Sequence, residues 1–494
     1  MPELSYANVQ TSEGELPPRQ HWLSFKMLGL VLGLLLILGA NLFLRKNLER
    51  TPLPDYPMLQ AYHNIEWWQF LLPLDWGVLT GDPYCKGVVH WCTTGIVLVQ
   101  ALAHYFALTK IFYALNAALI VVTFGISWWM LRSAVFTYTL TICMAFGTQF
   151  HWTYACSAVI TLYLFVIYLE INLLCFTKLL QTGRRCWQIA FTLTLIPVAL
   201  CVEYWLDYCA FLMVGSVLVL LYGWRAQVAD LKRRALFALV VSCVTAAIYL
   251  GIRLSVGQQQ YQPGQESEMI FTYSSPIPAV EDVISNVITF LYISISNYFP
   301  PFMVSSNSLY YLGAEQLVAE QNGYHEAKTH LVPMHHLFYW YFWAGITFAV
   351  FTYFLIRNTR LALQQKSVVH VYLTLAMVMI VCGFLVHTPI KYRPYLSVPL
   401  LTYKCIVSNV GVALLLAYGL MHARSILPRP RVLYPLLIVL VWGTIGYGAI
   451  TRPHYLSYLS RQVGMGELPN PRRNLTLPWF LRGPAPMAST QADN

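Results

Sequence analysis

Residues 24–44 read SFKMLGLVLGLLLILGANLFL, an apolar stretch whose single charged residue is Lys26. A hydrocarbon core of about 30 Å takes about 20 residues of helix to cross, and only a helix can satisfy its own backbone there. No small-residue cleavage site follows this stretch, so it predicts an anchor helix rather than a cleaved signal peptide. Several later stretches have the same length and character, and they predict further spans.

The composition of the whole chain supports this interpretation. Of its 494 residues, 57% are hydrophobic, 15% are aromatic and only 11% are charged. A soluble globular domain has about 25% charged residues, so these proportions indicate an integral membrane protein. The net charge of +10 does not indicate a nucleic-acid partner, because the basic residues lie mainly in short loops between apolar stretches. It indicates how the chain is oriented in the membrane.

Four short loops hold most of the basic residues, and Asp230 is the only acid among them. Cytoplasmic loops are rich in Lys and Arg, so all four are predicted to be cytoplasmic. Their basic residues are Lys178, Arg184 and Arg185; Arg225, Lys232, Arg233 and Arg234; Arg357, Arg360 and Lys366; and Arg424, Arg429 and Arg431.

The predicted fold is an all-α polytopic membrane protein with about 11 transmembrane helices, within a range of about 11 to 13. The alternation of loops places the N-terminus inside and the C-terminal tail outside. The predicted spans are 23–45, 111–131, 134–150, 155–178, 187–206, 208–222, 235–255, 336–356, 369–388, 399–423 and 432–450.

This parity requires that GVVHWCTTGIVLVQALAHYFAL (87–108) does not cross the membrane. His90 and His104 interrupt the segment, so we expect a helix in the outer interface or packed on the bundle. If the segment crosses, the N-terminal side must flip. Arg45, Lys46 and Arg50, which follow the first span, give that alternative some support.

Two large outer regions divide the chain. The second contains AVEDVISNVITFLYISISNYF (279–299), whose apolar residues recur at near-helical spacing and predict an interfacial helix. The expected organisation is a cytoplasmic tail (1–22), an N-terminal transmembrane module (23–255) with an outer loop (46–110), a large outer loop (256–335), a C-terminal transmembrane module (336–450) and an outer tail (451–494).

The first outer region carries four acids among aromatic residues: Asp55, Glu66, Asp75 and Asp82. A carboxylate at a membrane face can act as a general base toward a hydroxyl, because burial among Trp and Tyr raises its pKa toward the working range. The alternative is that these are ordinary solvated loop acids.

Two more groups of polar residues lie at predicted outer helix ends. Glu203 and Asp207 stand four residues apart and share a helix face, so they line a cavity or mark the water interface. His335 and His336 open a span and are either cavity residues or interfacial polar residues. The sequence has no HExxH or CxxC set for a metal and no nucleotide-binding or hydrolase motif.

The stretch HTPIKYRPYLSVPLLTY (387–403) contains two cations on the predicted outer face, Lys391 and Arg393. The positive-inside rule disfavours them there, but a site for a lipid-bound phosphate would use them, since Arg offers a bidentate fork and Lys a mobile charge. The alternative is that both side chains snorkel to the headgroups. Pro394 and Pro399 would keep the start of the following span irregular, which is tolerated where water or protein satisfies the backbone.

Three motifs together resemble the GT-C superfamily of polyprenyl-phosphate-dependent membrane glycosyltransferases, in the manner of the protein O-mannosyltransferases and lipid A aminoarabinose transferases. LPDYPMLQAY (53–62) is similar to the family's early acidic motif, PYCKGVVHW (83–91) to the start of its interfacial helix, and KYRPYLSVPLL (391–401) to its late basic motif. The usual Asp-Glu pair is Asp55-Tyr56 here, and the Lys-Pro order is lost around Lys86.

The resemblance implies transfer of a sugar from a polyprenyl-phosphate donor to a hydroxyl of a glycan, lipid or protein, with inversion at the anomeric carbon. It implies that Asp55 is the base, with Asp75 or Asp82 as alternatives. Lys86 would contact the sugar phosphate, and Lys391, Arg393 and Tyr395 would clamp the lipid phosphate. An outer acid cluster holding Mg²⁺ or Mn²⁺ and a reaction without metal both remain open.

Three other functions compete with this one. A transporter or flippase would use charges buried at mid-span, of which Glu170 is the clearest. An O-antigen ligase or polymerase would use an outer His or Arg with a diphosphate donor, and the relevant residues are His325, His330, His335 and His336. A non-catalytic scaffold subunit would explain the incomplete acidic pair. The short tail and compact loops favour a bacterial inner membrane, with the active site on the periplasmic face.

Overall fold

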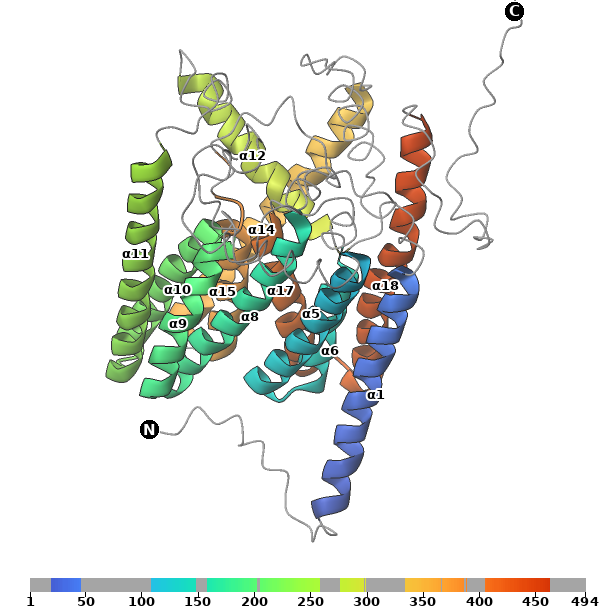
Figure 1. Cartoon of the computed structure of the whole chain (residues 1–494), viewed down its shortest axis with the longest axis horizontal. Helices are drawn as coiled ribbons and strands as arrows, with labels where there is room; N and C mark the ends of the chain where they lie inside the picture. Colours follow the sequence, from blue (N-terminus) through green and yellow to red (C-terminus); the bar gives the residue numbers. More distant parts are fainter. Residues whose placement is uncertain are drawn as a thin grey trace, which may run out of the picture.

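The protein is a bundle of helices (Figure 1). The computed structural model describes residues 19–45, 108–147, 158–201, 205–257, 276–296, 298, 334–365, 367–385, 388 and 405–462. Within these ranges there are 12 helices and no strand. They are α1 (Arg19–Arg45), α5 (Leu108–Leu131), α6 (Ala134–Phe146), α8 (Ala158–Thr182), α9 (Arg185–Cys201), α10 (Trp205–Arg225), α11 (Ala229–Gly257), α12 (Pro276–Ser296), α14 (Met334–Gln365), α15 (Val368–Cys382), α17 (Ile406–Ile426) and α18 (Pro430–Gln462).

All-helical membrane architecture is confirmed in its coarse form. Seven described helices are long and apolar enough to cross a bilayer: α1, α5, α8, α10, α11, α17 and α18. Each of the predicted spans overlaps a described helix, and the span 187–206 also reaches the first two residues of α10; most of the ends differ by a few residues. The crossing of α6, α9, α14 and α15, and with it the count of about 11, stays a prediction.

Short connections join consecutive antiparallel helices at one end of the bundle, which we call the basic end: residues 132–133, 183–184, 226–228 and 427–429. Side-chain contacts bring the corresponding helix ends together. Trp129 of α5 meets Trp187 of α9 with ring centroids 5.5 Å apart. Gln181 of α8 donates to the hydroxyl of Tyr372 of α15 at 3.1 Å. The described basic residues of the four predicted cytoplasmic loops therefore gather on one side, and Lys366 lies outside the described residues.

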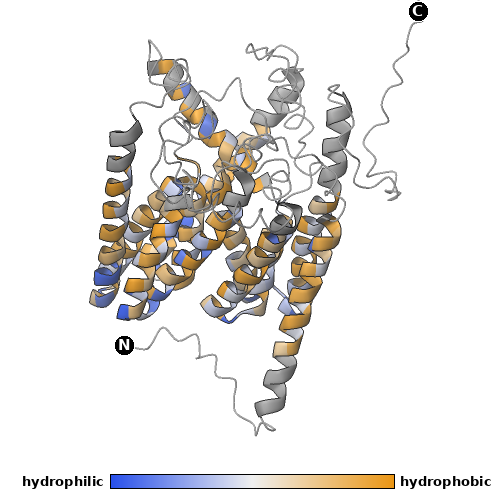
Figure 2. Cartoon of the chain, viewed as in Figure 1, coloured by the Kyte–Doolittle hydropathy of each residue, from blue (hydrophilic) through white to orange (hydrophobic). Residues whose placement is uncertain are grey.

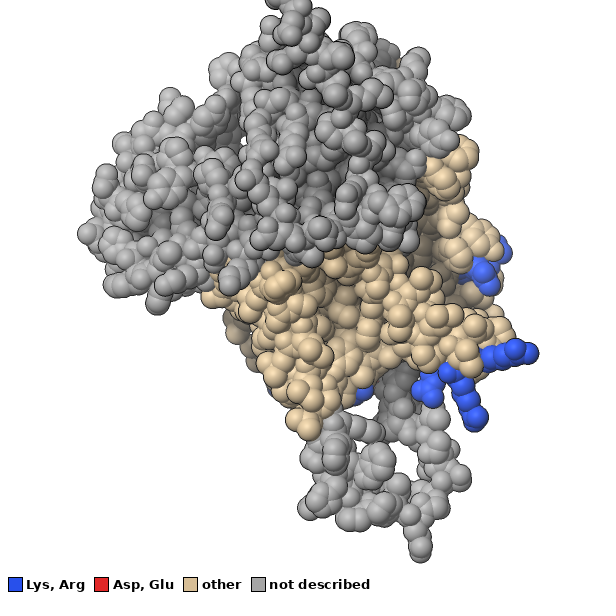
Figure 3. Space-filling view, turned by 90° about the vertical axis from the view of Figure 1, so that its right-hand side faces the viewer, with Lys and Arg blue, Asp and Glu red and all other residues tan. Residues whose placement is uncertain are grey.

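The charge distribution follows from these connections. Figure 2 shows hydrophilic residues at the lower ends of α9 and α11 and apolar residues along the helices. On the face in Figure 3, the visible charged side chains of the described residues are all basic and lie toward the lower part of the bundle. Asp230 is the only acid at the basic end within the described ranges. The structure thus groups the cations that the sequence assigned to the cytoplasmic side.

Each of the four connections named above contains one residue in the left-handed region. These residues are Arg132 (φ 54°), Gly183 (φ 65°), Gln227 (φ 57°) and Arg429 (φ 54°). Arg132 and Gly183 directly follow the last residue of α5 and of α8, where a left-handed residue stops the helix and redirects the chain, whereas Arg429 directly precedes α18. All four reversals thus contain a residue in the left-handed conformation, and only Gly183 adopts this conformation without a steric cost.

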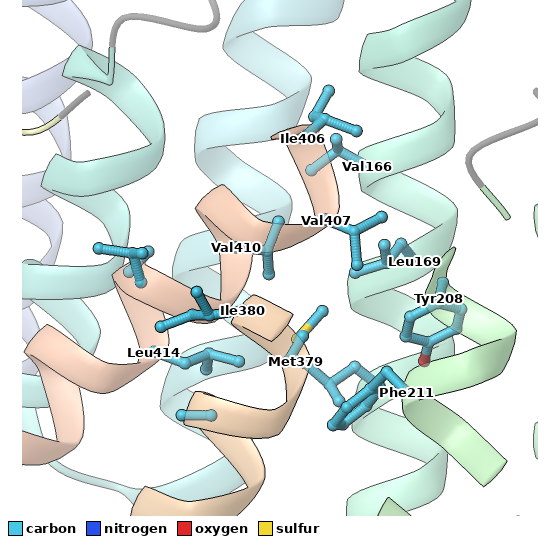
Figure 4. Close-up of a cluster of buried hydrophobic side chains, with 14 of the residues drawn as sticks. Val166, Leu169, Tyr208, Phe211, Met379, Ile380, Ile406, Val407, Val410 and Leu414 are labelled. Atoms are coloured by element: carbon cyan, nitrogen blue, oxygen red, sulfur yellow. The ribbon is translucent and has the colours of Figure 1, made fainter. Parts of the chain in front are cut away.

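The core of the bundle is formed by α8, α10, α15 and α17. Figure 4 shows Leu169 of α8, Phe211 of α10, Met379 of α15 and Val410 of α17 pointing into one apolar cluster. By contrast, α1 and α18 lie at the periphery and expose apolar side chains, such as Leu36 at 73% and Val439 at 66%. An apolar surface of this kind belongs against lipid rather than water.

Buried amides connect the helices inside this apolar surrounding. Asn116 of α5 donates to the side-chain oxygen of Asn41 of α1, and Asn41 donates to the carbonyl of Ala145 in α6. Asn172 of α8 donates to the carbonyl of Phe191 in α9 at 2.9 Å. Polar side chains between membrane helices fix which helices pair, at a gain of about 1 kcal/mol each.

Candidate functional site

The site expected from the sequence lies largely outside the described residues. Of its members, Asp207 is described with its side chain, and His335 and His336 belong to the first turn of α14 but their side chains lie outside. The remaining candidates all fall outside the described ranges: Asp55, Glu66, Asp75, Asp82, Lys86, Glu203, Lys391, Arg393 and Tyr395. The described residues instead include those on each side of residues 389–404, which we call the basic stretch. We call the helix ends that hold its two flanking residues, Thr388 and Cys405, the frame.

The frame lies at the far end of the bundle, opposite the basic end. There α15 ends at Cys382 and α17 begins at Ile406. Between them, Thr388 and Cys405 are the described residues that flank 389–404, which contains the proposed phosphate clamp. The positions of these two flanks limit where the clamp can lie.

The interfacial helix predicted over 279–299 is confirmed as a helix, α12, and it packs against both flanks. The amide of Asn286 donates to the carbonyl of Thr388 at 2.9 Å. On the other flank, the thiol of Cys405 points to the carbonyl of Phe290 at 3.9 Å. The hydroxyl of Tyr298, just after α12, donates to the carbonyl of Asn409 at 2.7 Å. The helix is therefore attached to the chain on each side of the basic stretch.

The C-terminal half of α12 is inserted into the bundle. Its residues from Phe290 to Ile293 are almost fully buried, whereas Val280 and Ile284 are exposed at 56% and 54%. Phe290 stacks on Phe384, with ring centroids 5.9 Å apart and planes 19° apart. This burial distinguishes α12 from a helix that lies only on the membrane surface. The C-terminal half of α12 is packed against the far end of the bundle.

The two helices that carry the flanks are in close backbone contact. A Cβ on Gly383 would lie 2.2 Å from the backbone nitrogen of Ser408, and one on Gly411 would lie 2.8 Å from the nitrogen of Ile380. The hydroxyl of Ser408 donates to the carbonyl of Ile380 at 2.6 Å. Only glycine permits this approach, so α15 and α17 hold the start and the end of the basic stretch at a set spacing.

Asp207 is fully buried in the first turn of α10. It lies near the thiol of Cys382, the last residue of α15. A carboxylate at the start of a helix also benefits from the helix dipole. Asp207 therefore lies inside the bundle near the start of the frame, and whether it lines a cavity stays a prediction.

Glu170 occupies a different place, in the middle of the span Tyr163–Thr182. It is 3% exposed, and the hydroxyl of Thr123 in α5 lies 2.9 Å and 2.7 Å from its two carboxylate oxygens. A single hydroxyl proton can bond to one of these oxygens at a time. An acidic residue buried inside a membrane bundle is a functional candidate, and Thr123 was not identified from the sequence.

Neither carboxylate is part of a metal-binding group within the described ranges. No set of three or more His, Cys, Asp or Glu side chains converges there. The partners that sequence reasoning missed, Asn286 and Thr123, share one signal, which is a polar residue between apolar neighbours in a helix. Polar residues in membrane helices usually have a partner inside the bundle, so this signal points to an interhelical contact without naming the partner.

Comparison with protein-family models and with curated proteins finds no match for this chain.

Proposed function

We propose that the protein is a membrane glycosyltransferase that moves a sugar from a polyprenyl-phosphate donor to an acceptor hydroxyl at the far end of the bundle. The observation that carries the proposal is the attachment of α12 to both flanks of the basic stretch, through Thr388 and Cys405. A phosphate clamp needs cations held at a set position, since donors that are already oriented stabilise developing charge without reorganisation.

Chain length ties the cations to this frame. Lys391 lies three residues and Arg393 five residues beyond Thr388. An extended chain spans at most about 3.6 Å per residue, so their Cα atoms lie within about 11 Å and about 18 Å of Thr388. The chain length is therefore compatible with cations at the far end of the bundle, where the phosphate of a membrane lipid would lie.

The proposed chemistry divides between two groups of residues. Lys391, Arg393 and Tyr395 would hold the leaving lipid phosphate and balance the charge that grows on it. Asp55 would remove the proton of the acceptor hydroxyl as that oxygen attacks the anomeric carbon, with Asp75 or Asp82 as alternatives. Displacement in one step inverts that carbon.

The remaining candidates would line the same cavity. Lys86 would contact the sugar phosphate, and Glu66 and Glu203 would add carboxylates to the acceptor side. His335 and His336 would lie at the start of α14, whose first turn follows the second outer region. Asp207 would interact with the site from the end of α15, because it is near Cys382.

The orientation follows from the basic end. Cytoplasmic loops carry the excess of Lys and Arg, so we place the basic end in the cytoplasm and the far end on the periplasmic face of a bacterial inner membrane. A polyprenyl-phosphate sugar would then reach the site from the outer leaflet. The donor phosphate, the cations and the acceptor would all lie on the same side.

The test measures transfer of labelled sugar from a polyprenyl-phosphate donor pool by membranes that hold the wild-type chain or one variant at matched abundance. Arg393→Ala and Asp55→Asn should each abolish transfer, while Arg424→Ala, which removes an exposed arginine at the basic end, should keep it. A parallel reaction with a chelator distinguishes a reaction that needs Mg²⁺ or Mn²⁺ from one that does not. Full transfer by Arg393→Ala would overturn the clamp.

Glu170 favours transport as a second candidate function. Buried acids within a membrane bundle often carry protons or bind coupled ions. Glu170→Gln preserves the size of the side chain and removes its charge. If the protein is a transporter, the wild type should move substrate across the membrane of proteoliposomes without transferring sugar. The Glu170→Gln variant should then lose this movement. If the protein is the proposed transferase, Glu170→Gln should retain transfer.

A further inference from the structure

A cavity of about 460 Å³ lies at the basic end, between α8, α10, α11, α15 and α17. This size falls within the range of about 300–1,000 Å³ that is usual for small-molecule sites. The cavity is at the opposite end of the bundle from the frame around 389–404, so it is separate from the proposed transferase site. An inference about it does not depend on that proposal.

The wall of the cavity is almost entirely apolar. Phe176, Phe211, Leu375 and Leu414 line it from four different helices. Tyr372 and Tyr418 also line it, and their rings stack with centroids 5.2 Å apart and planes 11° apart. A polar substrate would lose its hydration here without gaining hydrogen bonds. A hydrocarbon chain would instead be stabilised by burying its apolar surface against the wall.

Polar groups occur at the rim, where two cations converge on one residue. The ammonium of Lys178 donates to the side-chain oxygen of Gln181 at 3.2 Å, and the guanidinium of Arg234 donates to the backbone carbonyl of Gln181 at 3.0 Å. Gln181 and Arg234 line the cavity. The one acid in the lining, Asp230, is exposed in the first turn of α11.

The lining therefore carries one cation, Arg234, and one carboxylate, Asp230, next to an apolar cavity, and a second cation, Lys178, bonds to the lining residue Gln181. This pattern matches an amphiphile whose head is anionic and whose tail is a hydrocarbon. Arg and Lys are the usual partners of a phosphate, and each has donors beyond those used on Gln181 and, for Arg234, on the carbonyl of Leu180. Headgroups with a phosphate are also available in the adjoining leaflet, at the depth where the helices turn.

We propose that this cavity binds one hydrocarbon chain of a phosphate-bearing lipid, with the phosphate held at the rim by Lys178 and Arg234. The bound chain would fill the space between α8, α10, α11, α15 and α17 and hold these helices together at the basic end. The same chemistry is offered by an acyl phospholipid and by an isoprenyl phosphate. The experiment separates the two sources.

The test is native mass spectrometry of the full-length protein in detergent, after addition of dioleoylphosphatidylglycerol, undecaprenyl phosphate or the zwitterionic dioleoylphosphatidylcholine. The wild type should retain one molecule of an anionic lipid in preference to the zwitterionic lipid. Val371→Trp and Val228→Trp place a large ring in the cavity from α15 and from the α10–α11 connection, and each should lower retention about tenfold.

Matched controls make the result specific. Leu236→Trp introduces the same ring on α11 at a side chain that is 50% exposed, so it should retain lipid as the wild type does. Lys178→Gln should remove the preference for an anionic head, while Arg185→Gln, which removes one exposed charge at the same end, should keep it.

Every outcome of the experiment bears on the proposal. Retention of phosphatidylglycerol identifies an acyl lipid as the occupant, and retention of undecaprenyl phosphate alone identifies an isoprenyl lipid. Equal retention by Leu236→Trp and by either cavity variant that elutes as a single folded species overturns the proposal, because the cavity would then contribute nothing to binding. Two cavity variants are used so that misfolding of one leaves the other informative.

Discussion

The side-chain amide of Asn286 donates a hydrogen bond of 2.9 Å to the backbone carbonyl of Thr388, the residue that precedes the basic stretch. This single contact joins α12 to the end of α15 across 102 residues of chain. Under the proposed function, this contact would make α12 one wall of the site. The described residue just before the stretch that contains Lys391 and Arg393 is therefore held by α12.

Replacement of Asn286 should reduce activity beyond its effect on abundance. Asn286→Ala leaves the carbonyl of Thr388 without this partner, which costs about 1–3 kcal/mol for a buried group. We expect a lower melting temperature and a loss of sugar transfer per folded molecule. Val280→Ala, at an exposed position of the same helix, is the control and should be close to wild type. If Asn286→Ala transfers sugar at the wild-type rate, the contact between α12 and Thr388 is not needed for function.

Gly383 should not tolerate even a methyl group. The Cβ of Gly383→Ala would meet the backbone nitrogen of Ser408 at 2.2 Å, so α15 and α17 would have to separate. A thermal melt in detergent should show a large loss of stability, about 3 kcal/mol or more. Gly419→Ala on α17 is the control, because nothing lies within 4 Å of its added methyl. That variant should be neutral or more stable, by up to about 1 kcal/mol.

The left-handed residues at the basic end predict stabilising substitutions. Gln227 adopts φ 57° and Arg132 adopts φ 54°, which cost about 1 kcal/mol for a residue with a Cβ. Gln227→Gly should therefore raise the melting temperature, with the gain reduced by the greater freedom of glycine in the unfolded chain. Gly183→Ala should do the opposite, because Gly183 adopts φ 65° and its added methyl would meet the Arg234 side chain. A rise in stability for Gly183→Ala would contradict this account.

The pair formed by Thr123 and Glu170 should show measurable coupling. Their hydroxyl–carboxylate contact at 2.7 Å links α5 to α8 inside the membrane. A double-mutant cycle with Thr123→Val and Glu170→Gln should give a coupling free energy of about 0.6–1.7 kcal/mol, as for other polar pairs between membrane helices. Ser127→Ala is the control on α5, since Ser127 bonds to a carbonyl of its own helix. Additive effects of the first pair would show that the contact contributes nothing.

Cysteine labelling tests the orientation of the bundle. Cys186 is exposed at the start of α9, at the basic end. In a background in which every other cysteine is replaced, a membrane-impermeant maleimide should label Cys186 only from the cytoplasmic side. Leu385→Cys, at a far-end position that is 38% exposed, should react from the opposite side. Labelling of both from the same side would disprove the assigned topology.

Much of the architecture follows from local sequence patterns. A run of about 20 apolar residues must form a helix in a bilayer, so the stretch at 24–44 and its later counterparts predict their own structure. The spacing in 279–299 likewise predicted α12. Helix ends were less predictable: α14 has 32 residues against a predicted span of 336–356, because helical hydrogen bonding continues beyond the hydrocarbon core while hydropathy does not report it.

The candidate site was less accessible to sequence reasoning. The cations of the basic stretch were identifiable from the positive-inside rule, since they break it. The frame around them was not identifiable. Asn286 contacts the backbone carbonyl of Thr388, and every residue has such a carbonyl, so the sequence does not mark Thr388 as the partner. Glu170 was identified as a buried charge, but its partner Thr123 resembles any other threonine in a membrane helix. The lining of the basic-end cavity resembles ordinary core residues for the same reason.

The sequence by itself determined that this protein is a membrane protein, where its helices lie and which of their ends carry the positive charge. The hydropathy and the charge of each residue determine its preferred position in the bilayer. These properties can be read from the sequence without knowing which residues lie next to it in the fold. Only the tertiary structure decided that α12 joins both flanks of the basic stretch, that Asp207 lies near the end of α15 and that five helices enclose a cavity. Lipid tails are as apolar as leucine, so an apolar helix face does not reveal whether it meets lipid, another helix or an open space.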